Sequence, residues 1–257
     1  MTKQSVLASA LCGALVVGGS AEAGLIVVAN DEWTLSDAGF SGPNDPGTFA
    51  TNVAAWFTGG GPGTFHAYST NFGLTESSLA TAMTGAGHTW TTGTGITFDL
   101  PTLLTFDGIF LAGSSGSGAA NNAVLIAYVS AGGNVYLAGG TGTDFSGSAA
   151  AEAAAWNTFL NAFGLEFAST YNGSTTNLAV SSPHPIFVGV DSLFQSNGNS
   201  IVDLAPLDPQ NQILVGLSPD GLYAVFDPQV APVPEPSTIS LGILGLLGLA
   251  ARYRRRH

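Results

Sequence analysis

The sequence predicts an α/β domain with a mostly parallel sheet, helices on both faces of that sheet, and antiparallel strands added near the C-terminus. Two observations support this fold class. Short, continuously apolar runs alternate with segments whose apolar residues recur at helical spacing, which is typical of buried parallel strands connected by helices. After residue 167 the apolar runs become short and no helical segment separates them, which indicates antiparallel strands.

The first strands are predicted where apolar residues follow one another without interruption. A central strand of a parallel sheet is buried on both faces and therefore shows no alternation of apolar and polar residues. Residues 25–29 (LIVVA) have this pattern, and residues 108–112 and 134–138 resemble them. A further strand is expected at 65–69, between two helical segments.

The intervening helices are predicted from apolar spacing and from the residues at their ends. In residues 49–57 the apolar side chains fall on one helical face, and a run of glycines then ends the helix. Side chains that accept hydrogen bonds from a helix N-terminus mark the starts of other helices. The predicted helices are 49–57, 76–84 with Thr75 as N-cap, 122–131 capped by Asn121, and 149–163 closed by Gly164.

The last third of the domain has a different pattern. Short apolar runs lie at 177–180, 200–204, 212–217 and 222–227, and turn residues such as those at 219–221 separate them. We expect these strands to extend the main sheet and to add a hairpin.

A basic residue, an apolar core and small residues follow one another at the start of the chain. Lys3 precedes the apolar core, and an Ala-Glu-Ala sequence ends at Ala23. This order is typical of a secretory signal peptide and predicts cleavage between Ala23 and Gly24. Residues 1–23 would direct export through the Sec machinery and be removed by signal peptidase. A buried N-terminal helix is the alternative interpretation.

The other end of the chain contains a proline-rich motif, an apolar stretch and a basic tail. The uncharged stretch at 239–251 makes about 20 Å of helix, against a hydrocarbon core of about 30 Å, which predicts a short transmembrane helix. The basic tail would stay on the cytoplasmic side of the membrane. Low-complexity filler is the alternative. The segments are the motif Val233, Pro234, Glu235 and Pro236, the apolar residues 237–251, and the tail 252–257 with Arg252, Arg254, Arg255 and Arg256.

This order of segments resembles the PEP-CTERM sorting signal of Gram-negative bacteria. The resemblance implies that exosortase, a membrane protease-transpeptidase, cuts the chain near the Pro-Glu-Pro sequence. It also implies a transient anchor in the inner membrane and a final place at the cell surface or outside the cell. Proteins with this signal are commonly associated with exopolysaccharide and the biofilm matrix. Residues 24–232 would be the exported domain.

The exported domain contains no lysine, arginine or cysteine. Removing Glu22 and Glu235 from the 17 acidic residues leaves 15 in this domain. Such a surface cannot neutralise phosphate groups, which excludes nucleic acid and anionic lipid as partners. Cys12 leaves with the signal peptide, so cysteine nucleophiles, thiolate metal sites and disulfides are excluded. Stability must come from burial and hydrogen bonds.

Four stretches of the exported domain resemble the class I glutamine amidotransferase-like fold, one of the amidotransferase and flavodoxin-like open α/β sheets. They are residues 106–113 (FDGIFLAG), 127–142 (AYVSAGGNVYLAGGTG), 155–167 (AWNTFLNAFGLEF) and 184–190 (HPIFVGV). The resemblance covers about residues 25–227. It implies a crevice at the carboxyl ends of the strands.

In that family a cysteine on a sharp turn after a strand is the nucleophile, and backbone amides there stabilise the oxyanion. The matching turn, residues 139–143, has Thr141 and no cysteine. His184 would be a remnant of the catalytic base, or a loop-shaping residue between two prolines. We therefore expect a catalytically empty binding domain. The alternatives are a secreted hydrolase that uses Thr141, His184 or an acid such as Asp144 or Glu152, and a passive exported cargo.

Acidic residues follow the first predicted strand, where open parallel sheets bind ligands. They are Asn30, Asp31 and Glu32, with Asp37 close behind. Oxygen-rich side chains suit calcium, and Trp33 beside them suits stacking on a sugar ring. A solvated or hydrogen-bonding loop is the alternative, because the spacing does not match an EF-hand loop. No other cofactor is expected.

Overall fold

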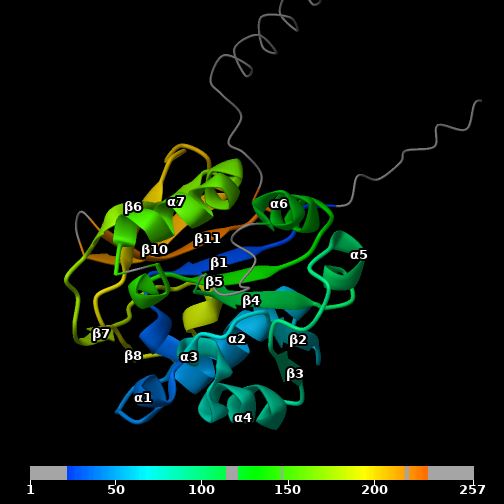
Figure 1. Cartoon of the computed structure of the whole chain (residues 1–257). Coiled ribbons are helices and arrows are strands. Elements are labelled where there is room, and N and C mark those ends of the chain that lie inside the picture. The colour runs from blue at the N-terminus through cyan, green and yellow to red at the C-terminus, as the bar shows by residue number, and fades with distance from the viewer. Residues whose placement is uncertain (1–21, 114–120, 146, 218–219, 231–257) are drawn as a thin grey trace, which may run out of the picture.

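A central β-sheet with helices packed on both faces forms the described part of the protein (Figure 1). The computed structural model describes residues 22–113, 121–145, 147–217 and 220–230. The strands are β1 (Ile26–Ala29), β2 (Thr64–Ala67), β3 (Thr89–Thr92), β4 (Gly108–Ala112), β5 (Val135–Ala138), β6 (Leu165–Tyr171), β7 (Asn177–Ala179), β8 (Ser192–Phe194), β9 (Asn199–Asp203), β10 (Asn211–Leu217) and β11 (Asp220–Phe226).

Helices connect the parallel strands and cover the sheet. They are α1 (Asp37–Phe40), α2 (Pro46–Thr58), α3 (Phe72–Thr75), α4 (Ser77–Gly85), α5 (Leu100–Leu103), α6 (Asn122–Ser130) and α7 (Ala149–Leu160), with short 3-10 helices at Glu32–Leu35, Gly142–Phe145, Asn161–Phe163 and Pro185–Phe187. Figure 1 shows α6 and α7 on one face of the sheet and α2, α3 and α4 on the other. The prediction of helices on both faces is confirmed.

The main sheet combines a parallel half with an antiparallel half. Its nine strands lie in the order β3-β2-β4-β5-β1-β11-β9-β6, and β10 pairs with β11. The five strands from β3 to β1 are parallel. The remaining strands pair antiparallel, beginning with β11 against β1. This arrangement confirms an α/β fold with a mostly parallel central sheet and antiparallel C-terminal strands.

β1 is the strand at which the two halves meet. Its four residues are fully buried, with β5 on one side and β11 on the other. Ile26 and Val28 pack in the hydrophobic cluster under α6 and α7, whereas Val27 and Ala29 pack in the cluster under α2 and α4. Burial on both faces explains why the sequence of β1 shows no polar alternation.

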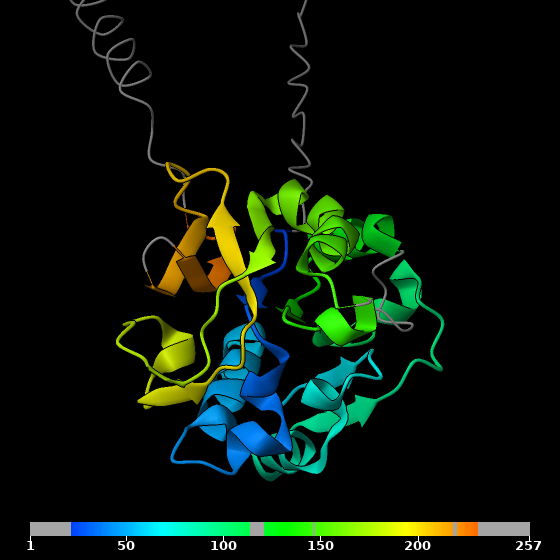
Figure 2. The ribbon, with the colours of Figure 1, turned by 60° about the vertical axis from the view of Figure 1, so that its left-hand side comes forward.

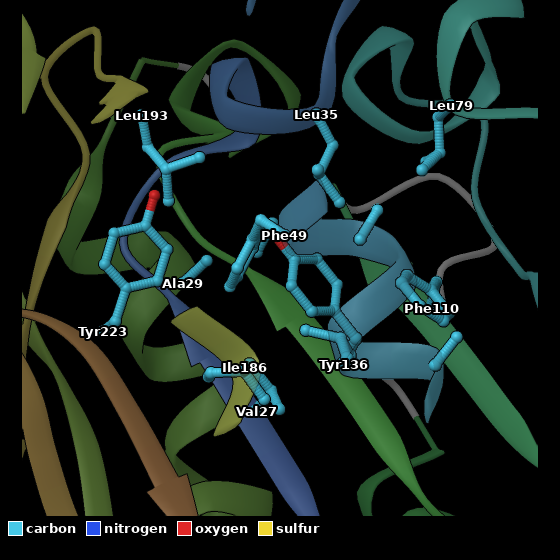
Figure 3. Close-up of a cluster of buried hydrophobic side chains, with 14 of the residues drawn as sticks. Val27, Ala29, Leu35, Phe49, Leu79, Phe110, Tyr136, Ile186, Leu193 and Tyr223 are labelled. Atoms are coloured by element: carbon cyan, nitrogen blue, oxygen red, sulfur yellow. The ribbon is translucent and has the colours of Figure 1, made fainter. Parts of the chain in front are cut away.

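Aromatic rings fill the cluster on the α2 side (Figure 3). Phe49 of α2 lies between Tyr136 of β5 and Tyr223 of β11, with ring centroids 6.3 Å and 5.4 Å away. Edge-to-face packing of this kind adds to the area that the rings bury. The cluster therefore joins α2 to both halves of the sheet.

A single buried amide connects three segments at the start of the parallel strands. Asn134 accepts a hydrogen bond from Leu25 N at 2.9 Å and donates to the carbonyls of Phe57 and Asp107 at 3.2 Å and 2.8 Å. These groups belong to the ends of β1 and α2 and to the turn before β4. Because these backbone groups are buried or part-buried and Asn134 pairs all three, its side chain stabilises this end of the fold.

Part of the C-terminal region does not extend the main sheet as predicted. β7 and β8 form a separate two-stranded sheet. Figure 2 shows this yellow pair beside the blue segment that contains α1 and α2. The Asp45 carboxylate at the start of α2 accepts hydrogen bonds from Asp191 N and Ser192 N, so polar contacts to α2 hold β8 away from the main sheet.

The predicted N-cap Thr75 is wrong. Thr75 ends α3, and Glu76 occupies the N-cap of α4. The reason is that Asn71 starts a separate helical turn by accepting from Gly73 N, while the Asp37 carboxylate accepts from Ser78 N in the first turn of α4. Asn121 does occupy the N-cap of α6, but its side chain makes no capping hydrogen bond.

Within the described ranges, no helix is long and apolar enough to cross a membrane. The predicted signal peptide up to residue 21, the predicted transmembrane helix at 237–251 and the basic tail lie outside these ranges.

We expect Asn134→Ala to lower the free energy of unfolding by about 2–4 kcal/mol, because it removes hydrogen bonds to one buried and two part-buried backbone groups. Asn122→Ala is the matched control, since it removes one hydrogen bond, to Ala155 O. Chemical denaturation of both variants measures the difference. Equal effects of the two substitutions would contradict the connecting role of Asn134.

Candidate functional site

The loops after β1 and β5 diverge at the carboxyl end of the parallel strands. β1 leads to α2 on one face of the sheet, and the neighbouring β5 leads to α7 on the other face. Open α/β sheets bind ligands at such a switch point, because the diverging loops leave a crevice between them. The acidic residues predicted as ligands, Asp31 and Glu32, follow β1 at this place.

Four acidic side chains gather here, and we call them the carboxyl cluster: Asp31, Glu32, Asp144 and Glu152. The Asn71 amide, from the loop after β2, donates to Glu32 Oε2 and to Asp144 Oδ2, the latter at 3.2 Å. Glu32 and Asn71 are buried, whereas Asp144 is half-buried. The amide of Asn71 therefore bridges two carboxyl groups that come from different strands.

Glu152 reaches the cluster from the first turn of α7. Its Oε1 accepts hydrogen bonds from Thr141 Oγ1 at 2.5 Å and from Thr141 N at 3.0 Å. Glu152 and Thr141 are both 0% exposed, and Glu152 Oε2 has no hydrogen-bond partner among the described residues. The predicted candidate Thr141 thus has a carboxyl group beside its hydroxyl, but neither group reaches the surface.

Two glycines allow other groups to approach the cluster closely. A side chain on Gly142 would place its Cβ 1.5 Å from the Tyr171 hydroxyl, and one on Gly113 would place it 2.0 Å from Asp144 Oδ2. Gly113 also has a φ of +76°, which favours glycine. The half-buried Tyr171 and Asp144 therefore form the outer side of the cluster.

Burial raises the pKa of both glutamates of the cluster. The pKa of Glu32 rises to about 8 because burial disfavours its charge; the Asn71 hydrogen bond opposes this shift and the nearby carboxylates add to it. Burial likewise raises the pKa of Glu152 to about 7, against the hydrogen bonds from Thr141. Glu32 and Glu152 therefore hold protons at neutral pH. No lysine or arginine of the exported domain is present to balance their negative charges.

The other predicted ligands of calcium have separate partners. Asp31 accepts hydrogen bonds from Trp33 N and Ser196 N, and burial raises its pKa to about 6. Asp37 binds Ser78 N in α4, and Asn30 is buried. Among the residues that the structure describes, no group of three or more His, Cys, Asp or Glu side chains could hold a metal ion.

His184 lies apart from Thr141. Its ring packs edge-on against Trp56 at 5.0 Å, and its Nδ1 accepts from Ile186 N at 3.4 Å, as the cap of the 3-10 helix Pro185–Phe187. Trp56 is near the C-terminal end of α2, which is the opposite end of the helix from the carboxyl cluster. Burial lowers the pKa of His184. The structure therefore does not bring this histidine to the Thr141–Glu152 pair.

The sequence gives no sign of two contributors to the site. Asn71 follows Ser69 and Thr70, Tyr171 follows Ser169 and Thr170, and neither occurs in a motif. The parallel register of β2, β4, β5 and β1 brings Asn71 beside Glu32, whereas Tyr171 comes from the end of β6 in the antiparallel half of the sheet. Tyr171 is close enough to Glu32 and Glu152 that their charges raise its pKa further, after burial.

Comparison with protein families matches residues 232–256 to the PEP-CTERM protein-sorting motif. The chain carries an exosortase sorting signal. This motif implies export, exosortase as the processing partner, and a destination in the cell envelope or at the cell surface. Neither curated proteins nor solved structures gave a match. The resemblance of the exported domain to the amidotransferase-like fold therefore rests on its sequence.

We expect the free energy of unfolding to fall as the pH rises from about 5 to 8. Glu32 changes its pKa from 4.5 in the unfolded chain to about 8 in the fold, so the folded state binds more protons in this window. Glu32→Gln should flatten this slope, by an amount of order 1–4 kcal/mol over the window.

Asp37→Asn is the control for this pH dependence. Hydrogen bonds from Ser78 lower the pKa of Asp37, so its contribution is lost only at lower pH, and the slope between pH 5 and 8 should stay unchanged. Denaturation curves at several pH values measure all three proteins. A Glu32→Gln slope equal to that of the parent protein would contradict the buried, protonated Glu32.

Proposed function

We propose that the protein is an exported, exosortase-processed surface or matrix protein whose domain binds exopolysaccharide through the carboxyl cluster and has no catalytic activity. The sorting motif supports the destination. The observation that carries the binding role is the position of the cluster at the switch point of the sheet, with Asn71 and Tyr171 beside it. Exposure of Asp144 and Tyr171 leaves this side open to a ligand.

The charges favour a neutral or amine-bearing glycan over an acidic one. Carboxyl, amide and phenol groups form hydrogen bonds with sugar hydroxyls. A uronic acid polymer would meet 15 acidic residues and no lysine or arginine in residues 24–232, and would be repelled. The amidotransferase-like assignment belongs to this proposal, and the alternation of strands and helices around β5 supports it.

A hydrolase is the second candidate, because the Thr141 hydroxyl donates to Glu152, whose pKa near 7 suits a general base. Two observations favour binding instead. Both groups are 0% exposed, and Thr141 N already donates to Glu152 and is not available to an oxyanion. Calcium binding at Asn30, Asp31, Glu32 and Asp37 is a third proposal, and the separate hydrogen-bond partners of Asp31 and Asp37 count against it.

We expect the domain to bind neutral or amine-bearing polysaccharide and not a uronate polymer. Asp144→Ala should weaken binding about ten-fold, since it removes a half-exposed acceptor. Asp191→Asn, an exposed carboxylate outside the cluster, is the control. Titration calorimetry with and without calcium measures these affinities. Glycan release in the same mixtures, lost in Glu152→Gln, would instead support the hydrolase.

Mass spectrometry of the protein from the producing cells tests the processing. We expect a surface form that starts at Gly24 and ends near Pro234, without the arginine tail. An extracellular protein that retains Arg252 to Arg256 would contradict exosortase processing. A form that starts before Gly24 would contradict the signal peptide cleavage and leave the sorting signal unaffected.

A further inference from the structure

We propose that the fold contains a binding site for its own new N-terminus: the α-ammonium group of Gly24, produced when the signal peptide is removed, docks at the C-terminal end of α6 and caps that helix. This inference rests on the proposed cleavage between Ala23 and Gly24. It goes beyond that cleavage, because it assigns a structural role to the charge that the cleavage produces.

The first observation is the contact between Gly24 and α6. Gly24 N donates to Val129 O at 2.7 Å, and Val129 is the next-to-last residue of the helix. The carbonyls of the last turn carry the negative end of the helix dipole, and they favour a cation nearby. The last turn of α6 contains no basic residue. The helix therefore offers a cation site, and the atom in that site is the nitrogen of Gly24.

The second observation is that the site accepts only glycine. A Cβ on Gly24 would lie 2.0 Å from Gly133 O and 2.5 Å from Gly133 C, both of which are backbone atoms. The next residue is also held, because Leu25 N donates to Asn134 Oδ1 and Leu25 O accepts from Val135 N. The position of Gly24 is therefore fixed by close packing on one side and by β1 on the other.

Hydrolysis at this bond changes the chemistry of the site without moving its atoms. Water adds across the Ala23–Gly24 peptide bond, the new carboxylate leaves on Ala23, and the amine on Gly24 takes up a proton near neutral pH. The ammonium group has three N–H donors in place of one. One donor keeps the bond to Val129 O. The others face a pocket of about 450 Å³ whose lining includes Trp56, Asn134 and Gln229.

Among the residues that line this pocket, Glu22 is the one with a charged side chain, and it leaves with the signal peptide. Apart from histidine, the ammonium group is then the sole cation of residues 24–232. We expect its pKa to lie above its ordinary value of about 8, so that its stabilising effect is complete below pH 8 and is lost at higher pH.

The test compares three forms of the exported domain that all end at residue 232; its hydrophobic clusters lie within residues 25–226 of the described chain, apart from the partly buried Ala23. One form starts at Gly24 after cleavage from a fusion protein, one is the same chain acetylated on that amine, and one starts at Ala23. At pH 6.5 the Gly24 form should have an unfolding equilibrium constant about two- to five-fold lower than the other two. At pH 10.5 the three should agree.

The absence of lysine provides a second measurement. Because the α-amine is the one primary amine of this chain, its rate of acylation against pH gives its pKa directly. We expect a higher pKa in the folded than in the denatured protein. Equal stabilities at pH 6.5, or equal pKa values in the two states, would refute the docking. A natural N-terminus other than Gly24 would refute the processing instead, whatever these forms show.

Discussion

The pairing of β1 with both β5 and β11 is the constraint on which the rest of the structure depends. Its four residues are fully buried, they belong to both hydrophobic clusters, and they join the parallel half of the sheet to the antiparallel half. The residues just before the strand contact α6 and Asn134, and the residues just after it are Asn30, Asp31 and Glu32. One short strand thus positions the N-terminal contact at one end and the acidic site at the other.

A domain without lysine or arginine has few ways to stabilise buried acidic side chains. Asn71 and Thr141 donate hydrogen bonds to Glu32 and Glu152, and burial favours the protonated form of both glutamates. Buried carboxyl groups in such a domain cost stability, because neither ion pairs nor solvent can balance them. This cost is the reason for proposing that the group of four carboxyl groups at the switch point of the sheet binds a ligand.

The sequence predicts the parts of the fold that burial determines. Continuous apolar runs locate β1, β4 and β5 closely, because strands buried on both faces must be apolar throughout. β3 is not predicted, since it lies at the edge of the sheet and three of its four residues are exposed threonines. At the site, Asp31 and Glu32 are predicted from their place after a strand. Asn71 is not, because it meets Glu32 across 39 residues of sequence through strand register alone.

The antiparallel pairing of β1 and β11 places the start and the end of the domain at one end of the sheet's strands, and the acidic residues at the other. Ile26 pairs with Phe226, so the start of β1 and the end of β11 lie at the same end of the strands. The acidic residues stand beyond the far end of β1, a strand length of about 13 Å away. A tether attached through the C-terminus therefore pulls on the end of the strands opposite the carboxyl cluster. Under the proposed function, this arrangement leaves the binding face directed away from the attachment point, both before and after exosortase cuts the chain.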